Sequence, residues 1–297
     1  MTRFVMMVGL PGSGKSTKAK ELADREAAIL HSSDSLREEL FGDASNVDKN
    51  AVLFQEINRR INKDLSEGKN VIYDATNTSY KRRKLFLESL KQECFKECYM
   101  VATPYEKCLE QNLGRKRTVP EHVIEKMYKN FFVPQYYEGW DNIQVVFNDE
   151  IDQDLDALFK DLDGISQDNP HHTLTIGEHC RKCMENVKET GGGEILEMAA
   201  LLHDIGKKFT KSFTDSKGNP SEEAHFYNHQ NVSAYLSLFY LKHFSKEKML
   251  ETAAYIQWHM QPFNLGTGKA RSKSVRLFGE EFCNNLEILH QADIAAK

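Results

Sequence analysis

The stretch GLPGSGKS, residues 9–16, constrains the fold of this chain more than any other feature. An apolar run, Phe4–Val8, precedes it and indicates a buried strand, and residues 17–25 follow with the pattern of a helix. A strand, a glycine-rich loop and a helix are the setting of a phosphate-binding loop, and these flanks disfavour a chance Gly/Pro turn. The sequence therefore predicts an α/β domain that binds ATP or another nucleoside triphosphate.

The chemistry of the loop suits a triphosphate with Mg²⁺. The glycines let backbone N–H groups turn toward the phosphates, and the helix adds the positive end of its dipole. Lys15 is placed to reach the β- and γ-phosphates, and Ser16 to supply a hydroxyl to Mg²⁺. The residues expected to bind the nucleotide are Gly9, Gly12, Ser13, Gly14, Lys15, Ser16 and Thr17.

Length and composition indicate two globular domains. The chain has 297 residues, and it contains no run close to the ~18 apolar residues of a membrane span. Because its first residues already begin a core strand, we expect no signal peptide, no membrane association and a cytoplasmic location. The net charge of −5 excludes a broad nucleic-acid-binding surface, so a nucleic-acid substrate requires a local basic patch.

The six cysteines are scattered, which predicts free thiols rather than a disulfide framework. Cys180 and Cys183 form a C-x-x-C pair that could indicate zinc or redox chemistry. A single pair within a helical pattern is more often a coincidence, and we prefer that interpretation.

Acidic side chains follow two predicted strands, at the end where α/β sheets bind ligands. Asp34 and Arg37 come after the strand at residues 27–31, and Asp74 lies in the strand at residues 70–78. Asp34 is a candidate general base and Arg37 a candidate ligand of an anionic acceptor; alternatively, Asp34 only caps the helix at residues 35–41. Asp74 is a candidate near the metal and the attacking group.

Two basic segments lie on the same side of the predicted sheet. Residues 112–120, NLGRKRTVP, separate strands expected at 99–103 and 143–147 and precede a helix at 121–131. This is where a kinase lid would place arginines on the transferring phosphate, which makes Arg115 and Arg117 candidates; the alternative is an ordinary basic loop. The run at residues 81–84, KRRK, begins another helix, and most such runs are only solvated.

Taken together, the motifs GLPGSGKS, Asp34-x-x-Arg37, Asp74-x-Thr-Asn77 and Arg-x-Arg-x-Val-Pro resemble the kinase module of the polynucleotide 5′-kinase family. The resemblance covers about residues 1–150. It implies that Lys15 and Ser16 hold ATP and magnesium, that Asp34 is the general base on a 5′-hydroxyl, and that Arg37 binds the neighbouring nucleic-acid phosphate. It further implies a lid arginine on the donor and makes Asp74 and Asn77 additional candidates. Related kinases of small molecules share these motifs, so the acceptor stays open.

The second half has a different character. Residues 163–170 carry the Gly, Pro and small polar residues of a boundary, so we place the first domain at 1–160 and the second at 168–297. Beyond the boundary the alternation of strands and helices stops, which predicts an all-helical domain. Most of the 11 histidines lie in this half, namely His171, His172, His179, His203, His225, His229, His243, His259 and His290.

The adjacent pair His203 and Asp204 ends an apolar helical run that begins at Met198. Buried polar groups need partners, and a metal ion is a natural partner for this pair. Imidazole and carboxylate ligands together suit a divalent transition ion such as Mn, Co, Ni or Fe.

His179, the pair His203-Asp204 and Asp293 follow the order found in the His-Asp (HD) phosphohydrolase superfamily, which the second half resembles. The resemblance implies that these four residues bind a metal that activates water toward a phosphate ester. His171 or His172 are alternatives to His179. Because Asp293 lies four residues before the end of the sequence, we expect either that its helix is short and frayed or that the protein continues beyond this sequence.

The segment from His225 to Ser233 resembles the helical HD domain attached to bacterial tRNA nucleotidyltransferases. That resemblance implies that His229 and His259 line the pocket and support a second metal or the phosphate. Lys207 either contacts the substrate phosphate or only caps a helix.

One module that adds phosphate and one that removes it suggest a bifunctional end-healing enzyme of RNA repair. The first would phosphorylate 5′-hydroxyl ends, and the second would remove a 3′-phosphate or 2′,3′-cyclic phosphate. The expected partners are nucleic-acid ends, with RNA favoured and tRNA included. The enzyme would act upstream of an RNA ligase. Two alternatives stay open: a small-molecule or nucleotide kinase fused to a nucleotide phosphohydrolase, and a phosphohydrolase regulated by ATP at a non-catalytic P-loop.

Overall fold

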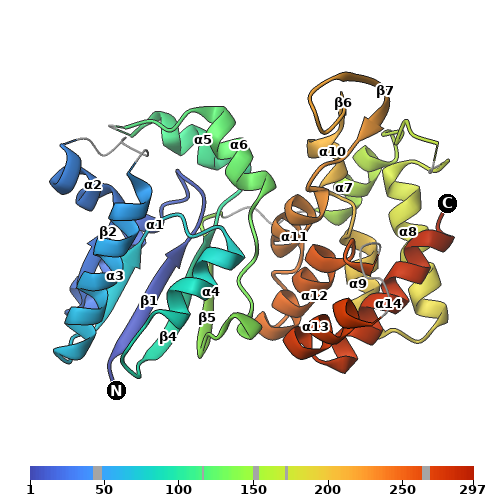
Figure 1. The fold of residues 1–297 in the computed structure, drawn as a ribbon. Helices are drawn as coiled ribbons and strands as arrows, with labels where there is room; N and C mark the ends of the chain where they lie inside the picture. Colours follow the sequence, from blue (N-terminus) through green and yellow to red (C-terminus); the bar gives the residue numbers. More distant parts are fainter. Residues whose placement is uncertain (43–48, 116, 150–153, 171–172, 263–267) are drawn as a thin grey trace. The chain divides into compact units, whose positions relative to one another are not determined.

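The chain forms two compact units, each of which is described by itself (Figure 1). The first consists of Met1–Met127 with Pro134–Glu150, and the second of Tyr128–Val133 with Ile151–Lys297. The computed structural model describes residues 1–42, 49–115, 117–149, 154–170, 173–262 and 268–297. His171 and His172, the alternatives to His179, therefore lie outside the described residues. The domain limits 1–160 and 168–297 stay predictions.

Five strands form a parallel sheet in the first unit, in the order β2-β3-β1-β4-β5. Their bounds are Arg3–Val8 (β1), Ile29–Ser32 (β2), Val71–Asp74 (β3), Phe95–Ala102 (β4) and Asn142–Phe147 (β5). The register pairs Ser32 with Asp74 and Met6 with Tyr73, so β1, β2 and β3 end at one edge of the sheet. The predicted α/β domain with a mainly parallel sheet is confirmed.

Six α-helices and one 3₁₀ helix belong to this part of the described chain. They are α1 Lys15–Glu26, α2 Ser33–Phe41, α3 Asn50–Ser66, α4 Tyr80–Glu88, α5 Tyr105–Leu113, α6 Glu121–Lys129 and η1 Tyr136–Glu138. The helix predicted at 121–131 thus ends two residues early.

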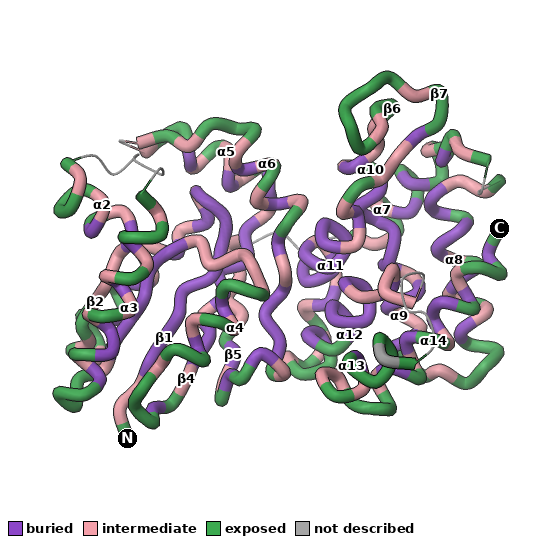
Figure 2. The backbone as a smooth tube through the Cα atoms, in the orientation of Figure 1, coloured by how far each residue is buried: buried purple, intermediate pink, exposed green. Residues whose placement is uncertain are grey.

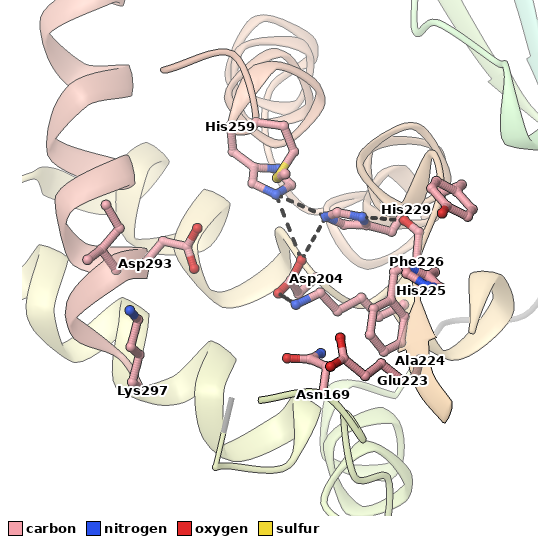
Figure 3. Close-up of a pocket in the computed structure, with 14 residues that line it drawn as sticks. Asn169, Asp204, Glu223, Ala224, His225, Phe226, His229, His259, Asp293 and Lys297 are labelled. Atoms are coloured by element: carbon pink, nitrogen blue, oxygen red, sulfur yellow. Dashed lines mark hydrogen bonds and ion pairs between the residues drawn. The ribbon is translucent and has the colours of Figure 1, made fainter. Parts of the chain in front are cut away.

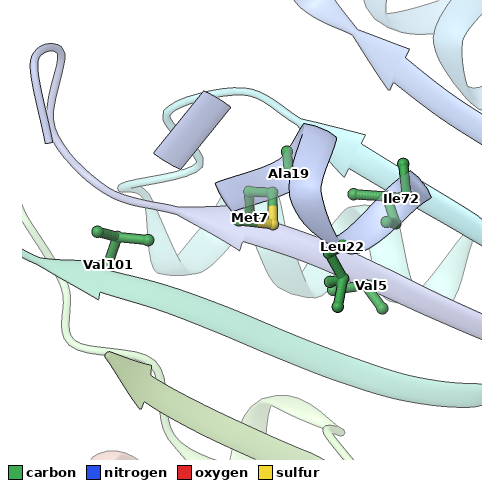
Figure 4. Packing of buried hydrophobic residues seen from close by; sticks show 7 residues of the cluster. Val5, Met7, Ala19, Leu22, Ile72 and Val101 are labelled. Atoms are coloured by element: carbon green, nitrogen blue, oxygen red, sulfur yellow. The ribbon is translucent and has the colours of Figure 1, made fainter. Parts of the chain in front are cut away.

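The two faces of the sheet are covered by different helices because successive residues of a strand point to opposite sides. Val5 and Met7 belong to one buried cluster with Ala19 and Leu22 of α1 (Figure 4). Phe4 points the other way and stacks on Phe86 of α4, with 5.6 Å between ring centroids. A central strand buried on both faces explains why Phe4–Val8 is an unbroken apolar run.

The second unit is mainly helical, as predicted. Its helices are α7 Leu155–Leu162, α8 Ile176–Glu189, α9 Gly193–Leu202, α10 Lys207–Thr210, α11 His229–Tyr240, α12 Lys246–Trp258, α13 Lys269–Phe278 and α14 Glu280–Ala295. Buried residues line α9, α11 and α12 (Figure 2). None of the helices in the described parts of the chain is long and apolar enough to cross a membrane.

Two expectations for the second unit need correction. A short antiparallel hairpin, β6 Ser212–Thr214 and β7 Pro220–His225, interrupts the helices. The sequence did not predict it because Ala224 is the only fully buried residue of these two strands, so they lack an apolar period. The helix that carries Asp293 is also not short, since α14 has 16 residues.

An ion pair is buried in the first unit. The guanidinium of Arg83 on α4 donates to both carboxylate oxygens of Glu138 at 2.7 and 2.6 Å, and the two side chains are 0% and 1% exposed. Arg83 also donates to the carbonyl of Asn77 at 2.9 Å, and Trp140 donates to Glu138 at 3.1 Å. The pair thereby ties α4 to η1 and to the loop that follows β3.

Replacing Arg83 by leucine is expected to reduce the free energy of unfolding by about 3–5 kcal/mol, because the Glu138 carboxylate would stay buried without its partner. Denaturant unfolding of the full chain, followed by hydrogen exchange at the amides of β1 and α4, measures the change. The control is Arg59→Leu, since Arg59 is 64% exposed and its ion pair with Glu56 is expected to contribute less than about 1 kcal/mol. Equal effects of the two substitutions would contradict this interpretation.

Candidate phosphoryl-transfer and metal sites

The glycine-rich loop has the backbone that a phosphate cradle needs. Gly12 and Gly14 adopt φ values of +83° and +85°. A Cβ atom on Gly12 would come within 2.1 Å of the carbonyl oxygen of Cys108, so this position requires glycine. Gly14 is the N-cap of α1, which places the loop at the positive end of the helix dipole.

A cavity of about 190 Å³ lies over this loop. Gln111 and Arg115 line it. So do five of the predicted nucleotide-binding residues, namely Gly12, Gly14, Lys15, Ser16 and Thr17. Ser13 is instead fully buried, and its carbonyl accepts hydrogen bonds from Thr103 at 2.9 Å and Asn148 at 3.2 Å. Gly9 packs against Ser13, since a Cβ atom on Gly9 would lie 2.6 Å from its hydroxyl oxygen. These two residues shape the loop from beneath.

A second cavity of about 160 Å³ adjoins the first and shares Lys15, Ser16 and Arg115 with it. We call it the transfer cavity. Asp74 lines it. So do all five residues predicted to be catalytic, namely Lys15, Asp34, Arg37, Arg115 and Arg117. The structure thus brings together residues from the P-loop, from the ends of β2 and β3 and from the segment after α5.

Asp34 is surrounded by arginines. Its carboxylate lies 3.0 Å from Arg37, 3.1 Å from Arg117 and 3.8 Å from Arg115, measured between oxygen and nitrogen atoms. Ser32, not Asp34, is the N-cap of α2. The alternative that Asp34 only caps this helix is therefore wrong.

Asp74 and Asn77 follow β3 but play different parts. Asp74 is 5% exposed, and its Oδ1 has no hydrogen-bond partner among the described residues. Ser16 lines the same cavity, and a carboxylate and a hydroxyl oxygen are suitable ligands for Mg²⁺, which prefers oxygen. Asn77 adopts φ +47° and donates to the carbonyl of Met7 at 2.9 Å, so it braces the strand that leads into the P-loop.

Burial lowers the pKa of Lys15, and the carboxylates of Asp74 and Asp34 oppose this shift. A triphosphate in the cradle would add further negative charge next to the ammonium group and favour its charged form.

In the second unit, the four residues predicted to bind metal come together from α8, α14 and the turn after α9. Nε2 of His179 lies 3.2 Å from Nε2 of His203, 3.3 Å from Oδ2 of Asp204 and 3.0 Å from Oδ1 of Asp293. Nε2 of His203 lies 3.3 Å from Asp204 and 3.5 Å from Asp293. Two imidazoles and two carboxylates thus converge on one point, with side-chain exposures of at most 11%.

His229 and His259 form a second group on the other oxygen of Asp204. Their Nε2 atoms lie 3.2 Å apart, and they are 3.1 and 3.8 Å from Oδ1 of Asp204. This oxygen has no hydrogen-bond partner among the described residues in spite of these short distances. The Asp204 carboxylate therefore lies between two pairs of histidines.

The orientation of the four rings is fixed by their other nitrogen. Each Nδ1 lies 2.7 Å from a backbone carbonyl oxygen, which can only accept a hydrogen bond; the partners of His179, His203, His229 and His259 are Ala296, Ala200, Phe226 and Ile256. In a ring protonated at Nδ1 alone, the Nε2 lone pair faces the two carboxylates and the neighbouring ring. A bound cation would lie between these atoms, and the donor set of imidazoles and carboxylates fits divalent transition metals.

Electrostatics in the absence of metal agree with a site built for positive charge. Burial opposes ionisation of His203, yet the neighbouring Asp204 carboxylate raises the pKa of this ring well above its usual value. Burial likewise opposes ionisation of Asp204, but His203 and Lys207 hold its pKa well below the usual range. Burial, together with His203 and His229, lowers the pKa of His259 to about 3, so this ring is neutral and able to bind a metal.

A cavity of about 470 Å³ opens onto Asp204, His229, His259 and Asp293 (Figure 3). Lys207 also lines it, and its ammonium group lies 2.6 Å from Asp204 Oδ2 and 2.7 Å from the side-chain oxygen of Gln167. Lys207 thus belongs to the site and is not only a helix cap.

Sequence reasoning missed three residues of this region. Asn169 and His225 line the cavity, and Gln167 orients Lys207. They come from the loop before α8 and from β7, and their spacing in the sequence carries no periodic signal. The segment that begins at His225 resembles an HD domain, but its sequence did not predict that His225 itself lines the cavity.

All six cysteines are free and buried. Cys180 and Cys183 point into the core from α8, and neither belongs to the clusters of candidate metal ligands among the described residues. This agrees with the interpretation of the C-x-x-C pair as a coincidence.

Comparisons with known proteins agree with this architecture. Residues 4–134 match a family model described as AAA domain, and residues 171–296 match one described as HD domain. The chain therefore combines an N-terminal P-loop kinase domain with a C-terminal helical HD domain. Kinase and HD-type hydrolase domains together indicate an enzyme.

Individual relatives are distant. The L-seryl-tRNA(Sec) kinase of Methanococcus maripaludis is 27% identical over 244 residues, which cover 75% of this chain and 93% of the relative. A chain of the Pnkp1/Rnl/Hen1 RNA repair complex is 22% identical with a TM-score of 0.41, covering 43% of this chain and 43% of that one, so this chain spans less than half of its length. A gluconokinase from Sinorhizobium meliloti 1021 is 15% identical with a TM-score of 0.38, covering 50% of this chain and 84% of that one. Structural likenesses of this size do not bear on the reaction.

The donor geometry predicts that the full chain retains Mn²⁺ or Ni²⁺ after dialysis, as measured by inductively coupled plasma mass spectrometry. His203→Ala removes a ligand and is expected to weaken binding by at least about tenfold. The matched control is His243→Ala, because His243 is exposed in the same unit. Metal retention that is the same in both variants would show that the cluster is not a metal site.

Proposed function

We propose that this chain is a bifunctional end-healing enzyme of RNA. The P-loop domain transfers the γ-phosphoryl group of ATP to a 5′-hydroxyl, and the HD domain removes a 3′-phosphate or a 2′,3′-cyclic phosphate. Such ends, tRNA ends among them, would then be ready for an RNA ligase.

The observation that carries the kinase half is the transfer cavity. A hydroxyl kinase needs a donor cradle, a carboxylate that accepts the hydroxyl proton and positive charge on the transferring group. Lys15, Asp34 and Arg117 supply these three functions within one cavity. The relative from Methanococcus maripaludis is named for a seryl-tRNA substrate, which supports an acceptor carried by RNA.

The proposed transfer uses side chains of this chain as follows. Lys15 contacts the β- and γ-phosphates, and Asp34 accepts the proton of the attacking hydroxyl. Arg117 and Arg115 exchange their contact with Asp34 for the transferring phosphoryl group, which leaves the carboxylate free to act as base. When bound at Ser16 and Asp74, Mg²⁺ offsets charge on the phosphates.

In the HD domain, His179, His203, Asp204 and Asp293 would hold a metal, with His229 and His259 on the second oxygen of Asp204. When bound, the metal supplies Lewis-acid activation of water. The side chains of the cavity bind and orient the ester: Lys207 contacts a phosphate oxygen, and His225 and Asn169 line the same cavity. Burial of the cluster strengthens these electrostatic contacts.

A second candidate function for the first domain is the phosphorylation of a hydroxyl borne by a tRNA-linked amino acid. It is favoured by the seryl-tRNA kinase relative, of which this chain covers 93%. A small-molecule acceptor and a purely regulatory P-loop are the remaining alternatives.

Phosphate transfer from labelled ATP to a 5′-hydroxyl RNA oligomer tests the kinase half. Lys15→Ala and Asp34→Asn are each expected to lower kcat by at least about 100-fold, because one removes charge from the transferring group and the other removes the base. Lys20→Ala is the control, since Lys20 is an exposed lysine on the same helix. Labelling of seryl-tRNA without labelling of 5′-hydroxyl RNA would instead support the second candidate.

The hydrolase half is tested with 3′-phosphate and 2′,3′-cyclic phosphate RNA ends in the presence of Mn²⁺ or Ni²⁺. His203→Ala is expected to abolish phosphate release while the kinase activity stays intact, because the two reactions use separate sites. His243→Ala should release phosphate at the wild-type rate. Release that survives in His203→Ala would refute the assignment of the reaction to the HD domain.

A further inference from the structure

A cavity in the first unit has no part in the phosphoryl transfer described above. It has a volume of about 620 Å³ and is lined by α3, α4 and the chain that follows β3; we call it the α3/α4 cavity. The transfer cavity, at about 160 Å³, is smaller than the roughly 300–1,000 Å³ of typical ligand pockets. It has room for the reacting groups, but the rest of an acceptor has to extend elsewhere.

The two cavities share part of their walls. Phe54, Ala75 and Thr76 line both of them. Arg37 marks the junction, since it donates to Asp34 at 3.0 Å and to Asn50 of the α3/α4 cavity at 3.0 Å. Its Nε is buried without a hydrogen-bond partner among the described residues, so a donor remains available there.

The lining of the α3/α4 cavity combines aromatic rings, amides and one positive charge. Phe54 and Phe86 contribute partly exposed rings, and Phe86 stacks on the buried Tyr73 with centroids 5.0 Å apart. Asn50 and Asn58 contribute side-chain amides, and none of the described residues that line the cavity is Asp or Glu. Stacking surfaces combined with positive charge are the features that bind single-stranded nucleic acids.

The residues of the basic run at 81–84 differ in burial and in what they contact. Arg83 forms the buried ion pair with Glu138, whereas Lys81 is exposed and does not line the cavity. Arg82 is exposed and lines the cavity, and no carboxylate of the described residues pairs with it. Arg82 is therefore available to an anionic ligand at the cavity rim.

We propose that the α3/α4 cavity binds the second nucleotide of a 5′-hydroxyl RNA acceptor. The base of this nucleotide stacks on the aromatic rings, and the phosphate that follows it contacts Arg82. The first nucleotide occupies the transfer cavity and presents its hydroxyl to Asp34, with the phosphate between the two nucleotides at Arg37. The inference rests on the proposed kinase function and adds that the acceptor is a strand and not a lone nucleoside.

Two acceptors that differ by one nucleotide test this inference in the full-length protein. Uridine 3′-methylphosphate and the corresponding uridine dinucleotide both end in a phosphodiester, so neither is a substrate for removal of a terminal phosphate. The wild type is expected to show a kcat/KM at least about tenfold higher for the dinucleotide, in line with the contribution of one stacked base. An equal kcat/KM for both acceptors would overturn the proposal.

Surface variants keep the test independent of folding. Arg82→Ala and Leu85→Ala change exposed residues of α4 that line the cavity, Leu85 being 65% exposed. Each should reduce the dinucleotide advantage by about fivefold or more, whereas the KM for ATP stays unchanged. The matched controls are Lys81→Ala on α4 and Val52→Ala on α3, exposed residues outside the cavity. Loss of the advantage in the controls to the same extent would refute the assignment.

Photocrosslinking separates failure of this inference from failure of the proposed function. A 5′-hydroxyl oligoribonucleotide with 5-iodouracil at its second position should crosslink to Phe54 or Phe86, as mapped by mass spectrometry. If the wild type phosphorylates neither acceptor, the kinase assignment is wrong, and the crosslink still reports where RNA binds. A crosslink outside α3, α4 and β3, or none, overturns the α3/α4 cavity as the nucleotide site.

Discussion

The first domain depends on the parallel pairing of β2, β3 and β1. Parallel strands end at one edge, and here the register places Ser32 opposite Asp74. The P-loop after β1, Asp34 after β2 and Asp74 at the end of β3 therefore meet over a single cavity. An antiparallel β3 would put Asp74 at the opposite edge, so the site is a consequence of topology as much as of side-chain chemistry.

The second domain depends in the same way on one buried carboxylate. Asp204 is 2% exposed, and each of its oxygens faces a pair of imidazoles. Removing these groups from water is costly unless positive charge compensates, and Lys207 at 2.6 Å supplies only part of it. The backbone carbonyls that accept from every Nδ1 hold the rings in the one orientation that directs their lone pairs inward. The packing of the helices thus assembles a cluster of carboxylates and imidazoles that a bound cation would stabilise.

Much of the architecture could be predicted because its signals are local. An apolar run followed by GLPGSGKS predicts strand, loop and helix, and the adjacent His203 and Asp204 at the end of an apolar helix indicate a buried polar site. The hairpin of β6 and β7 escaped prediction because its residues are mostly exposed. The different positions of Lys81, Arg82 and Arg83 could not be predicted either. Only the buried ion pair with Glu138 distinguishes Arg83 from its basic neighbours.

The sequence by itself determined the chemistry that the chain carries: a phosphate cradle, candidate acids and arginines, and an ordered set of histidines and aspartates. These are properties of residue types at short spacings, and the backbone rules of strands, loops and helices suffice to interpret them. Only the tertiary structure decided which of these groups meet, because His179 and Asp293 are more than a hundred positions apart and lie 3.0 Å from each other only once α8 and α14 have packed. The α3/α4 cavity was decided there too, since a cavity is a property of surfaces that no single segment contains.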